Sequence, residues 1–170
     1  VPPPSRDIRK TALDPDFWYP VARGVEVKRG KPKACSFAGE PIVLVRGAGD
    51  RVFALEDRCA HRQVPLSTGV VDGDGLRCGY HGLCYDTTGK CIEIPGQTYV
   101  PPRARVRAYP VAERHRLLWI WMGDAARAHA DLPQDAPVRL AHLRLGDRYR
   151  AATPRVDARA IRPWLRRRPS

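Results

Sequence analysis

The chain has 170 residues, a formal net charge of +12, and 43% hydrophobic and 28% charged residues, which is too apolar a composition for a wholly disordered protein. It contains no run of about eighteen apolar residues, and its first thirty residues lack an apolar core of signal-peptide type, which argues against a membrane span and against secretion. Five cysteines are too few for a disulfide scaffold. We therefore expect one domain, with or without a tail, in the reducing cytoplasm.

Short strands separated by Gly- and Pro-containing turns are expected after a loose, Pro-rich start at Val1–Lys10. The expected strands, in chain order, are Phe17–Val27, Pro41–Arg46, Arg51–Glu56, Arg105–Ala112 and Leu117–Met122. The segment Gly47–Asp50 has the composition of a hairpin turn between the second and third of these strands. No long helix is expected before residue 124, and no internal repeat is apparent. The pattern predicts an all-β fold, an antiparallel sandwich or barrel.

The composition changes near residue 124. Residues 125–170 contain 11 Arg, 10 Ala and 5 Pro but 4 Asp, so this stretch carries a net charge of +7. An Arg-rich tail is typical of nucleic-acid or acidic-membrane binding, but Tyr149 and Trp164 are its only aromatic residues for base stacking. It also has no amphipathic period. We therefore expect a solvated extension, with neither a membrane nor a nucleic acid as partner.

Two short segments carry the chemistry, Cys59-Ala60-His61 and Cys78-Gly79-Tyr80-His81, with sixteen residues between them. Each offers one thiolate and one imidazole. A zinc ion would take all four ligands tetrahedrally, whereas a Rieske [2Fe–2S] cluster would take the two cysteines on one iron and the two histidines on the other. Zinc fingers of the common type keep their cysteines in one segment and their histidines in another. The mixed segments therefore favour the cluster, with zinc as the alternative.

Around these segments the sequence resembles the N-terminal Rieske domain of the Rieske non-haem iron oxygenases, in the branch of the vanillate O-demethylase oxygenase and phthalate-dioxygenase-like α subunits. The resemblance covers roughly residues 14–124. It is carried by Phe17–Ala22 (FWYPVA), Leu55–Arg62 (LEDRCAHR), Cys78–Asp86 (CGYHGLCYD) with Gly89–Ile92 and Ile94-Pro95, Arg105–Val111 (RVRAYPV) and Leu118–Asp124 (LWIWMGD). Leu83 and Gly79 replace a Trp and a Pro that are common in the family, and neither position is a ligand.

The resemblance implies that Cys59 and Cys78 bind one iron of the cluster and that His61 and His81 bind the other. It also implies a Rieske fold, in which an antiparallel β sandwich or barrel carries a two-loop cluster-binding subdomain. Respiratory Rieske proteins have a further cysteine in each loop, and the two form a disulfide. The first loop here (Arg62–Leu66) has no cysteine, so we expect a cluster of low potential, as in the oxygenases.

Members of the family continue into a catalytic domain whose mononuclear non-haem iron is held by two His and one carboxylate. The implied activity is monooxygenation, dioxygenation or O-demethylation of an aromatic compound. The implied partners are a flavin reductase or ferredoxin as electron donor and, in a homotrimer, further copies of the chain. No matching iron motif follows Asp124, because the spacing of His129, Asp131 and His142 differs from the family's. We therefore expect the electron-transfer half of an oxygenase without the mononuclear iron.

The resulting division is a leader at 1–13, a Rieske [2Fe–2S] domain at 14–124 and an Arg/Ala/Pro-rich tail at 125–170. Three explanations of this tail compete: a truncated chain, a natural stand-alone protein, and an out-of-frame reading of an oxygenase gene. The last is favoured, because GC-rich DNA read out of frame yields Arg, Ala and Pro. The alternative functions are a stand-alone Rieske ferredoxin-type electron carrier and a zinc-stabilised β-domain with a nucleic-acid-binding tail. The remaining cysteines and histidines are expected to be structural thiols and surface imidazoles: Cys35, Cys84, Cys91, His115, His129 and His142.

Overall fold

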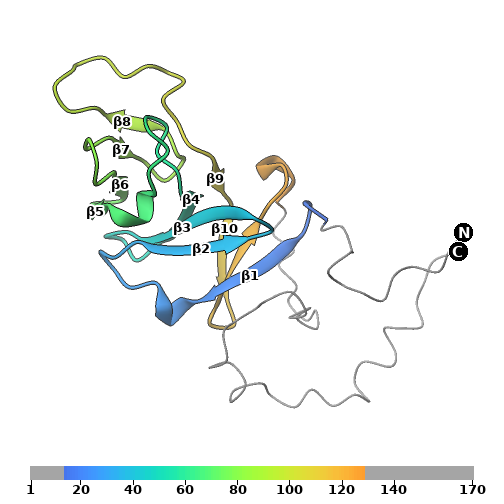
Figure 1. The fold of residues 1–170 in the computed structure, drawn as a ribbon. Coiled ribbons are helices and arrows are strands. Elements are labelled where there is room, and N and C mark those ends of the chain that lie inside the picture. The colour runs from blue at the N-terminus through green and yellow to red at the C-terminus, as the bar shows by residue number, and fades with distance from the viewer. Residues whose placement is uncertain (1–13, 129–170) are drawn as a thin grey trace, which may run out of the picture. The chain divides into compact units, whose positions relative to one another are not determined.

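The computed structural model describes residues 14–128, which form eleven β-strands in three antiparallel sheets and three single-turn 3-10 helices (Figure 1). The prediction of an all-β domain is confirmed. The leader at 1–13 and the tail from residue 129 onward, with His129, Asp131 and His142, lie outside the described residues. No helix within residues 14–128 is long and apolar enough to cross a membrane.

The first sheet has the strand order β1-β11-β10 and is built from the two ends of the domain: β1 (Trp18–Arg23), β10 (Val111–Arg114) and β11 (Leu117–Trp121). The strand predicted at Phe17–Val27 ends earlier, because the chain turns into a 3-10 helix at Gly24–Glu26. Strands β10 and β11 form a hairpin whose turn residues, His115 and Arg116, have φ of 54° and 64°. Positive φ at both central residues is the type I′ geometry that matches the twist of paired strands.

The second sheet has the order β2-β3-β4-β9 and contains the predicted hairpin. Its strands are β2 (Lys33–Phe37), β3 (Glu40–Arg46), β4 (Val52–Glu56) and β9 (Ala108–Tyr109). The apolar run of β3 is buried at four successive residues because both faces of the strand are covered. Val43 and Val45 pack into one apolar cluster, while Ile42 and Leu44 pack into a second. This alternation is the period of two that an extended chain imposes on its side chains.

The strand predicted at Arg105–Ala112 is wrong as a single element. Residues Ala108–Tyr109 form β9 in the second sheet, and Val111–Arg114 form β10 in the first. Pro110 lies between them; it has no N–H to donate to a strand ladder, and its carbonyl accepts the N–H of Trp121 at 3.1 Å. The chain therefore changes sheets at this proline.

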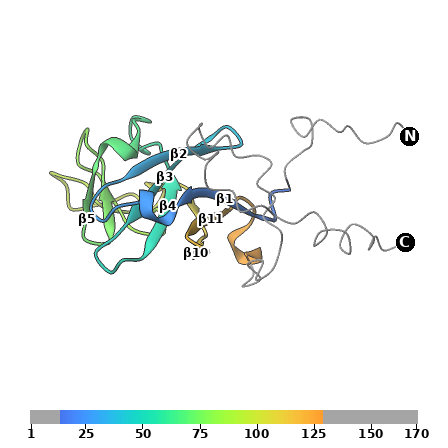
Figure 2. The same cartoon turned by 90° about the horizontal axis from the view of Figure 1, so that it is seen from below.

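The third sheet, in the order β5-β6-β7-β8, is made of strands of two or three residues. They are β5 (Val70–Asp72), β6 (Gly75–Arg77), β7 (Cys84–Tyr85) and β8 (Cys91–Glu93). Figures 1 and 2 show this sheet at the end of the domain away from β1 and β10. Its central turn and its link to the second sheet carry the two predicted ligand segments.

Candidate metal centre

The two ligand segments are loops at the same end of the domain. The first loop follows β4 and runs to the 3-10 helix at Leu66–Thr68, and it carries Cys59 and His61. The second loop joins β6 to β7 and carries Cys78 and His81. Because β6 and β7 pair directly, the second loop is a tight connection with a fixed backbone.

The first loop is closed by its own backbone. The N–H of Cys59 donates to the carbonyl of Val64 at 2.9 Å, and the N–H of Gln63 donates back to the carbonyl of Cys59 at 2.9 Å. Gln63 reaches this position in the left-handed region, with φ of 58°. These two bonds fold the segment between Cys59 and Val64 into a compact turn around the first histidine.

The second loop repeats the same backbone pattern. The N–H of Cys78 donates to the carbonyl of Leu83 at 2.8 Å, and the N–H of Gly82 donates to the carbonyl of Cys78 at 3.1 Å. Gly82 is left-handed, with φ of 77°, which is the conformation that glycine adopts without steric cost. The two loops are therefore equivalent in their backbone, although their histidines differ by one position relative to the cysteine.

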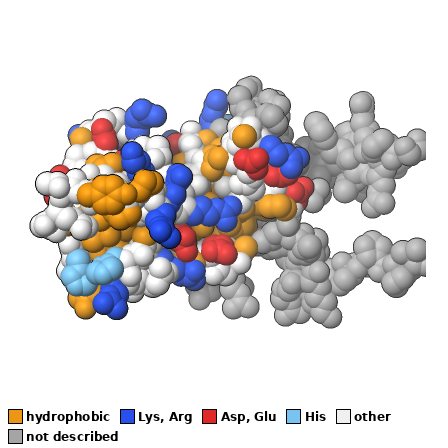
Figure 3. All heavy atoms as spheres, turned by 90° about the horizontal axis from the view of Figure 1, so that it is seen from above, with side chains coloured by type: hydrophobic (Ala, Val, Ile, Leu, Met, Phe, Trp, Pro, Cys, Tyr) orange, Lys and Arg blue, Asp and Glu red, His pale blue; other side chains and the backbone are white. Residues whose placement is uncertain are grey.

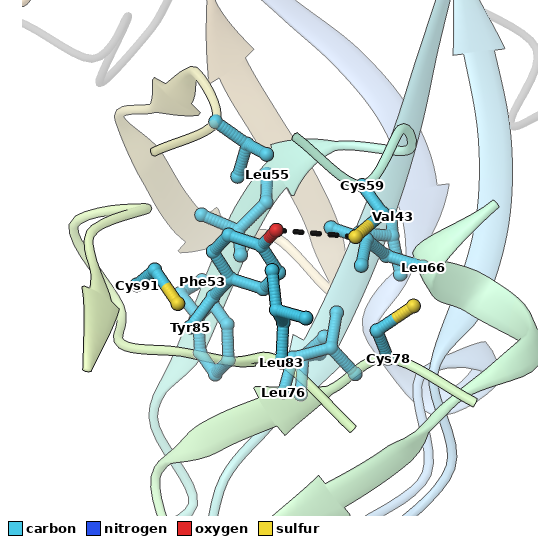
Figure 4. Packing of buried hydrophobic residues seen from close by; sticks show 12 residues of the cluster. Val43, Phe53, Leu55, Cys59, Leu66, Leu76, Cys78, Leu83, Tyr85 and Cys91 are labelled. Carbon is cyan, nitrogen blue, oxygen red and sulfur yellow. Dashed lines mark hydrogen bonds between the residues drawn. The ribbon is translucent and has the colours of Figure 1, made fainter. Parts of the chain in front are cut away.

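The two cysteine thiols lie in the interior. Cys59 and Cys78 are 2% and 3% exposed and belong to one apolar cluster, and Figure 4 shows both sulfur atoms at the same margin of that cluster. Burial raises the pKa of the Cys78 thiol, the neighbouring Cys59 thiol raises it further, and the backbone N–H groups of Tyr80 and His81 act in the opposite direction. Those N–H groups are the donors that would favour a thiolate at Cys78.

Tyr85, on β7, reaches across to the first loop. Its hydroxyl lies 3.2 Å from the Cys59 sulfur (Figure 4). The same hydroxyl accepts the backbone N–H of Ala60 at 3.1 Å. Either atom of the oxygen–sulfur pair could donate, but a Cys59 thiolate can only accept, so with a thiolate at Cys59 the Tyr85 hydroxyl is the donor. Burial and the neighbouring Cys59 raise the pKa of Tyr85, so the hydroxyl stays protonated.

The two imidazoles face the surface. His61 and His81 are exposed, and their Nδ1 atoms lie 3.1 Å apart. Figure 3 shows histidine side chains next to one another at one end of the molecule, beside apolar side chains. The ring of Tyr80 lies against that of His81, with ring centroids 3.8 Å apart. An open cavity of about 630 Å³ adjoins both imidazoles and is also lined by Ile94–Gln97, Pro101, Arg103 and Ala104.

The four donors therefore separate into two like pairs, thiol beside thiol and imidazole beside imidazole. Within residues 14–128, no three Cys, His, Asp or Glu side chains converge on one point that suits a single ion. A structural zinc ion requires four donors around one centre. Two pairs of like donors are the arrangement that two irons of one cluster require, one iron for each pair.

The other described cysteines and histidine stand apart from the imidazole pair. Cys84 and Cys91 are buried, and the Cys91 thiol donates to the carbonyl of Glu93 at 3.3 Å. Figure 4 shows Cys91 at the margin of the apolar cluster opposite to Cys59 and Cys78. Burial raises the pKa of the half-buried Cys35 to about 11, and His115 is exposed in the β10–β11 turn.

A buried carboxylate supports the first loop and is not predicted from the sequence as a functional residue. Asp57 is 7% exposed, and its carboxylate accepts the Ser67 N–H at 2.6 Å and the Ser67 hydroxyl at 2.7 Å. This contact ties the start of the first loop to its end. Its signal in the sequence is weak, because Asp57 and Ser67 form no recognisable spacing motif.

Comparison with known proteins agrees with this site. The model of the Rieske [2Fe-2S] domain family matches residues 17–110. A putative toluene-4-sulfonate monooxygenase system iron-sulfur subunit of Comamonas testosteroni is 50% identical over 114 residues, which are 67% of this chain and 33% of the relative. The vanillate O-demethylase oxygenase subunit of a Pseudomonas species is 49% identical over 89 residues, 52% of this chain and 27% of the relative. A crystal structure of apo dicamba monooxygenase matches with a TM-score of 0.67 and 37% identity over 71% of this chain and 37% of that chain.

The fold and the two Cys/His loops thus define an all-β iron–sulfur domain. The chain belongs to the Rieske [2Fe-2S] domain family, and the relatives named above are oxygenase components. The chain spans about a third of the length of the curated relatives that it matches.

Proposed function

We propose that Cys59 and Cys78 hold one iron of the family's [2Fe–2S] cluster and that His61 and His81 hold the other. The observation that carries this assignment is the pairing of like donors, with adjacent buried thiols and imidazole nitrogens 3.1 Å apart. The equivalent backbone turns of the two loops support it further, since each turn carries one cysteine and one histidine.

When bound, such a cluster accepts and releases one electron at a time. The chain's own residues make its two sides different. On the cysteine side, Leu66, Leu76 and Tyr85 are fully buried and exclude water. On the histidine side, both imidazoles are exposed. A partner protein therefore has access to the domain at the imidazole edge, and electron transfer uses this edge.

The cluster has a low potential for its class. A thiolate cluster ligated by two neutral imidazoles lies between roughly −150 and +300 mV, and the first loop has no cysteine for the disulfide that accompanies the high-potential type. A spectroelectrochemical titration is expected to give a midpoint in the lower half of that range. A midpoint above about +100 mV would contradict this assignment.

Elemental analysis of anaerobically purified protein, with EPR of the reduced form, tests the ligand assignment. We expect iron and acid-labile sulfide in the 1:1 ratio of a [2Fe–2S] cluster, with Cys78→Ser and His81→Ala losing both. Cys91→Ser is the matched control for the first variant, because Cys91 is equally buried. His115→Ala is the control for the second, because His115 is an exposed imidazole on another sheet. Stoichiometric zinc without sulfide would overturn the proposal.

In the whole protein, the domain passes electrons from a flavin reductase or a ferredoxin to a mononuclear non-haem iron, for monooxygenation, dioxygenation or O-demethylation of an aromatic compound. The relatives that are named as oxygenase components support this role. The chain acts in the cytoplasm, where thiols such as Cys35, Cys84 and Cys91 stay reduced, and its full-length form assembles as a homotrimer. Size-exclusion chromatography with light scattering checks the trimer, and reduction by purified reductases checks the donor.

A stand-alone Rieske ferredoxin-type carrier is the second candidate. An out-of-frame origin of residues 125–170 would distinguish the oxygenase domain from the carrier, because it requires a catalytic domain encoded in another reading frame. Translating the encoding DNA in the other two frames beyond codon 124 tests this origin. We expect a His-x₄-His segment there, and its absence from both frames would refute the out-of-frame origin.

A further inference from the structure

Arg77 is the last residue of β6 and directly precedes the proposed ligand Cys78. Its guanidinium makes contacts with three separate elements. Nε and Nη2 donate to the Asp72 carboxylate of β5 at 3.1 and 2.6 Å. Nη1 and Nη2 donate to the two oxygens of the Glu93 carboxylate of β8 at 3.1 and 2.8 Å. Nη1 also donates to the backbone carbonyl of Gly82 at 2.9 Å.

The Gly82 carbonyl belongs to the residue that follows His81 in the second loop. The Gly82 N–H is already bonded to the Cys78 carbonyl, so Arg77 fixes the other polar group of the same residue. The N–H lies in the peptide unit that joins His81 to Gly82, and the carbonyl lies in the unit that joins Gly82 to Leu83, so both peptide units around Gly82 are held. With both units held, the backbone that leaves His81 has one course.

We propose that Arg77 is a positioning residue for the metal centre, which holds His81 in place by anchoring the Gly82 carbonyl to the two carboxylates of β5 and β8. The inference rests on the proposed function, because it takes His81 as a ligand. Arg77 acts through the backbone of the second loop, because its side chain bonds to Asp72, Glu93 and the Gly82 carbonyl.

The planar guanidinium is suited to this role, because its five N–H donors form a rigid fork. Isolated surface ion pairs contribute little to stability, whereas bidentate arginine–carboxylate geometry within a network is the exception. The hydrogen bonds that Arg77 donates to Glu93 and then to Asp72 raise the pKa of Arg77, and the same contact lowers the pKa of Glu93.

The first loop offers a natural comparison. Arg58 precedes Cys59 as Arg77 precedes Cys78, and the loops are equivalent in their backbone. In the described part of the chain, Arg58 donates to Glu56 at 3.3 Å and to no carbonyl of the first loop. That loop is supported from the interior by the Asp57–Ser67 contact instead. The same residue type thus stands at equivalent positions, and at one of them it anchors the loop.

The test uses the full chain loaded with cluster and compares Arg77→Gln, Arg77→Lys and Arg58→Gln. The readouts are the rate of iron loss to a chelator, the g values and line widths of the reduced EPR signal, and the midpoint potential. We expect Arg77→Gln to lose iron about ten- to hundredfold faster than wild type, the effect of one lost charge-assisted hydrogen bond, with broader EPR lines. Arg58→Gln is expected to match wild type in all three.

Arg77→Lys separates position from charge. An ammonium keeps the positive charge but cannot serve three elements at fixed angles, so we expect it to behave like Arg77→Gln. If lysine restores the wild-type rate and spectrum, the charge alone acts and the positioning role is refuted. Equal effects of Arg77→Gln and Arg58→Gln would refute it as well.

If Arg77→Gln does not fold, Glu93→Gln provides the same test, because it weakens the same anchor. The side chain of Glu93 is exposed, so its replacement leaves the fold intact while weakening the anchor, and we expect iron loss about two- to threefold faster. An unchanged rate and spectrum in this variant would count against the proposal. A wild-type chain that holds no iron and sulfide would instead refute the proposed function itself, so the two failures are distinguishable.

Discussion

The contact between Tyr85 and Cys59 gives the sharpest prediction for the redox properties of the domain. In Tyr85→Phe, the ring keeps its place in the apolar cluster, and the change removes the hydroxyl that lies 3.2 Å from the Cys59 sulfur. Hydrogen bonds to a cluster's sulfur ligands raise its potential, because they stabilise the more negative, reduced state. We therefore expect the midpoint potential of Tyr85→Phe to fall.

The size of the shift follows from the burial of the contact. Tyr85 and Cys59 are 0% and 2% exposed, so water does not replace the lost donor. A hydrogen bond to a charged group contributes about 1.5–3 kcal/mol. If the reduced state gains about half of this, roughly 0.75–1.5 kcal/mol, the one-electron potential falls by about 30–65 mV, since 59 mV corresponds to a tenfold change in the equilibrium constant.

The assay is a redox titration followed by EPR or circular dichroism, with Tyr109→Phe as the matched control. Tyr109 is also buried, and its hydroxyl has no hydrogen-bond partner among residues 14–128. Removing that hydroxyl is expected to leave the potential within about 10 mV of wild type. A rise in the potential of Tyr85→Phe, or a fall no larger than that of the control, would refute the reasoning.

Three further substitutions test the support of the loops and the core. Gly82→Ala is expected to lower stability by about 2 kcal/mol, because its left-handed φ disfavours a side chain and the new Cβ would lie 2.8 Å from Cγ of Pro95. Ser67→Ala removes one of the two donors to buried Asp57, and a cost of about 1.5–3 kcal/mol is expected. Leu55→Ala opens a cavity in the apolar cluster that contains both proposed cysteine ligands, at a cost of about 2.7–5 kcal/mol. Thermal or denaturant unfolding of the loaded protein measures all three.

Each of these substitutions has a control elsewhere in the domain. Gly30→Ala has the same positive φ but no heavy atom within 4 Å of the added Cβ, so the difference between the two glycine variants isolates the contact with the neighbouring proline. Ser36→Ala changes an exposed serine on β2, and Val25→Ala changes a side chain that is 73% exposed. Both are expected to stay within about 0.5 kcal/mol of wild type. Losses in these controls that equal those of their partners would contradict the structural explanation.

Long apolar strands and their hairpin are predictable from the sequence, because each strand is either a continuous apolar run or an alternating segment of five or more residues. The runs at Pro41–Arg46 and Arg51–Glu56 correspond to β3 and β4, and the turn between them was marked by its glycines. The strands of the third sheet are different. At two or three residues each, they are too short to show a period, and tertiary contacts alone make them strands.

The mixed Cys/His spacing in the sequence indicates the candidate site, but not the contacts that support it. Tyr85 and Arg77 act on loops through hydrogen bonds that depend on the packing of the third sheet. The equivalence of the two loops is also not predictable from the sequence, because His61 lies two residues and His81 three residues after its cysteine. It is visible only in the backbone bonds of Cys59 and Cys78.

The burial of β3 on both faces has a consequence for how this domain can change. Odd-numbered residues such as Val43 and Val45 contact the cluster that contains the two proposed cysteine ligands, whereas Ile42 and Leu44 contact the one that joins the first two sheets. Substitutions at the odd-numbered residues of β3 therefore alter the packing around the metal centre. Substitutions at the even-numbered residues alter the packing between the first two sheets. Natural variation can adjust the electron-transfer properties and the stability of the domain separately, residue by residue along the same strand.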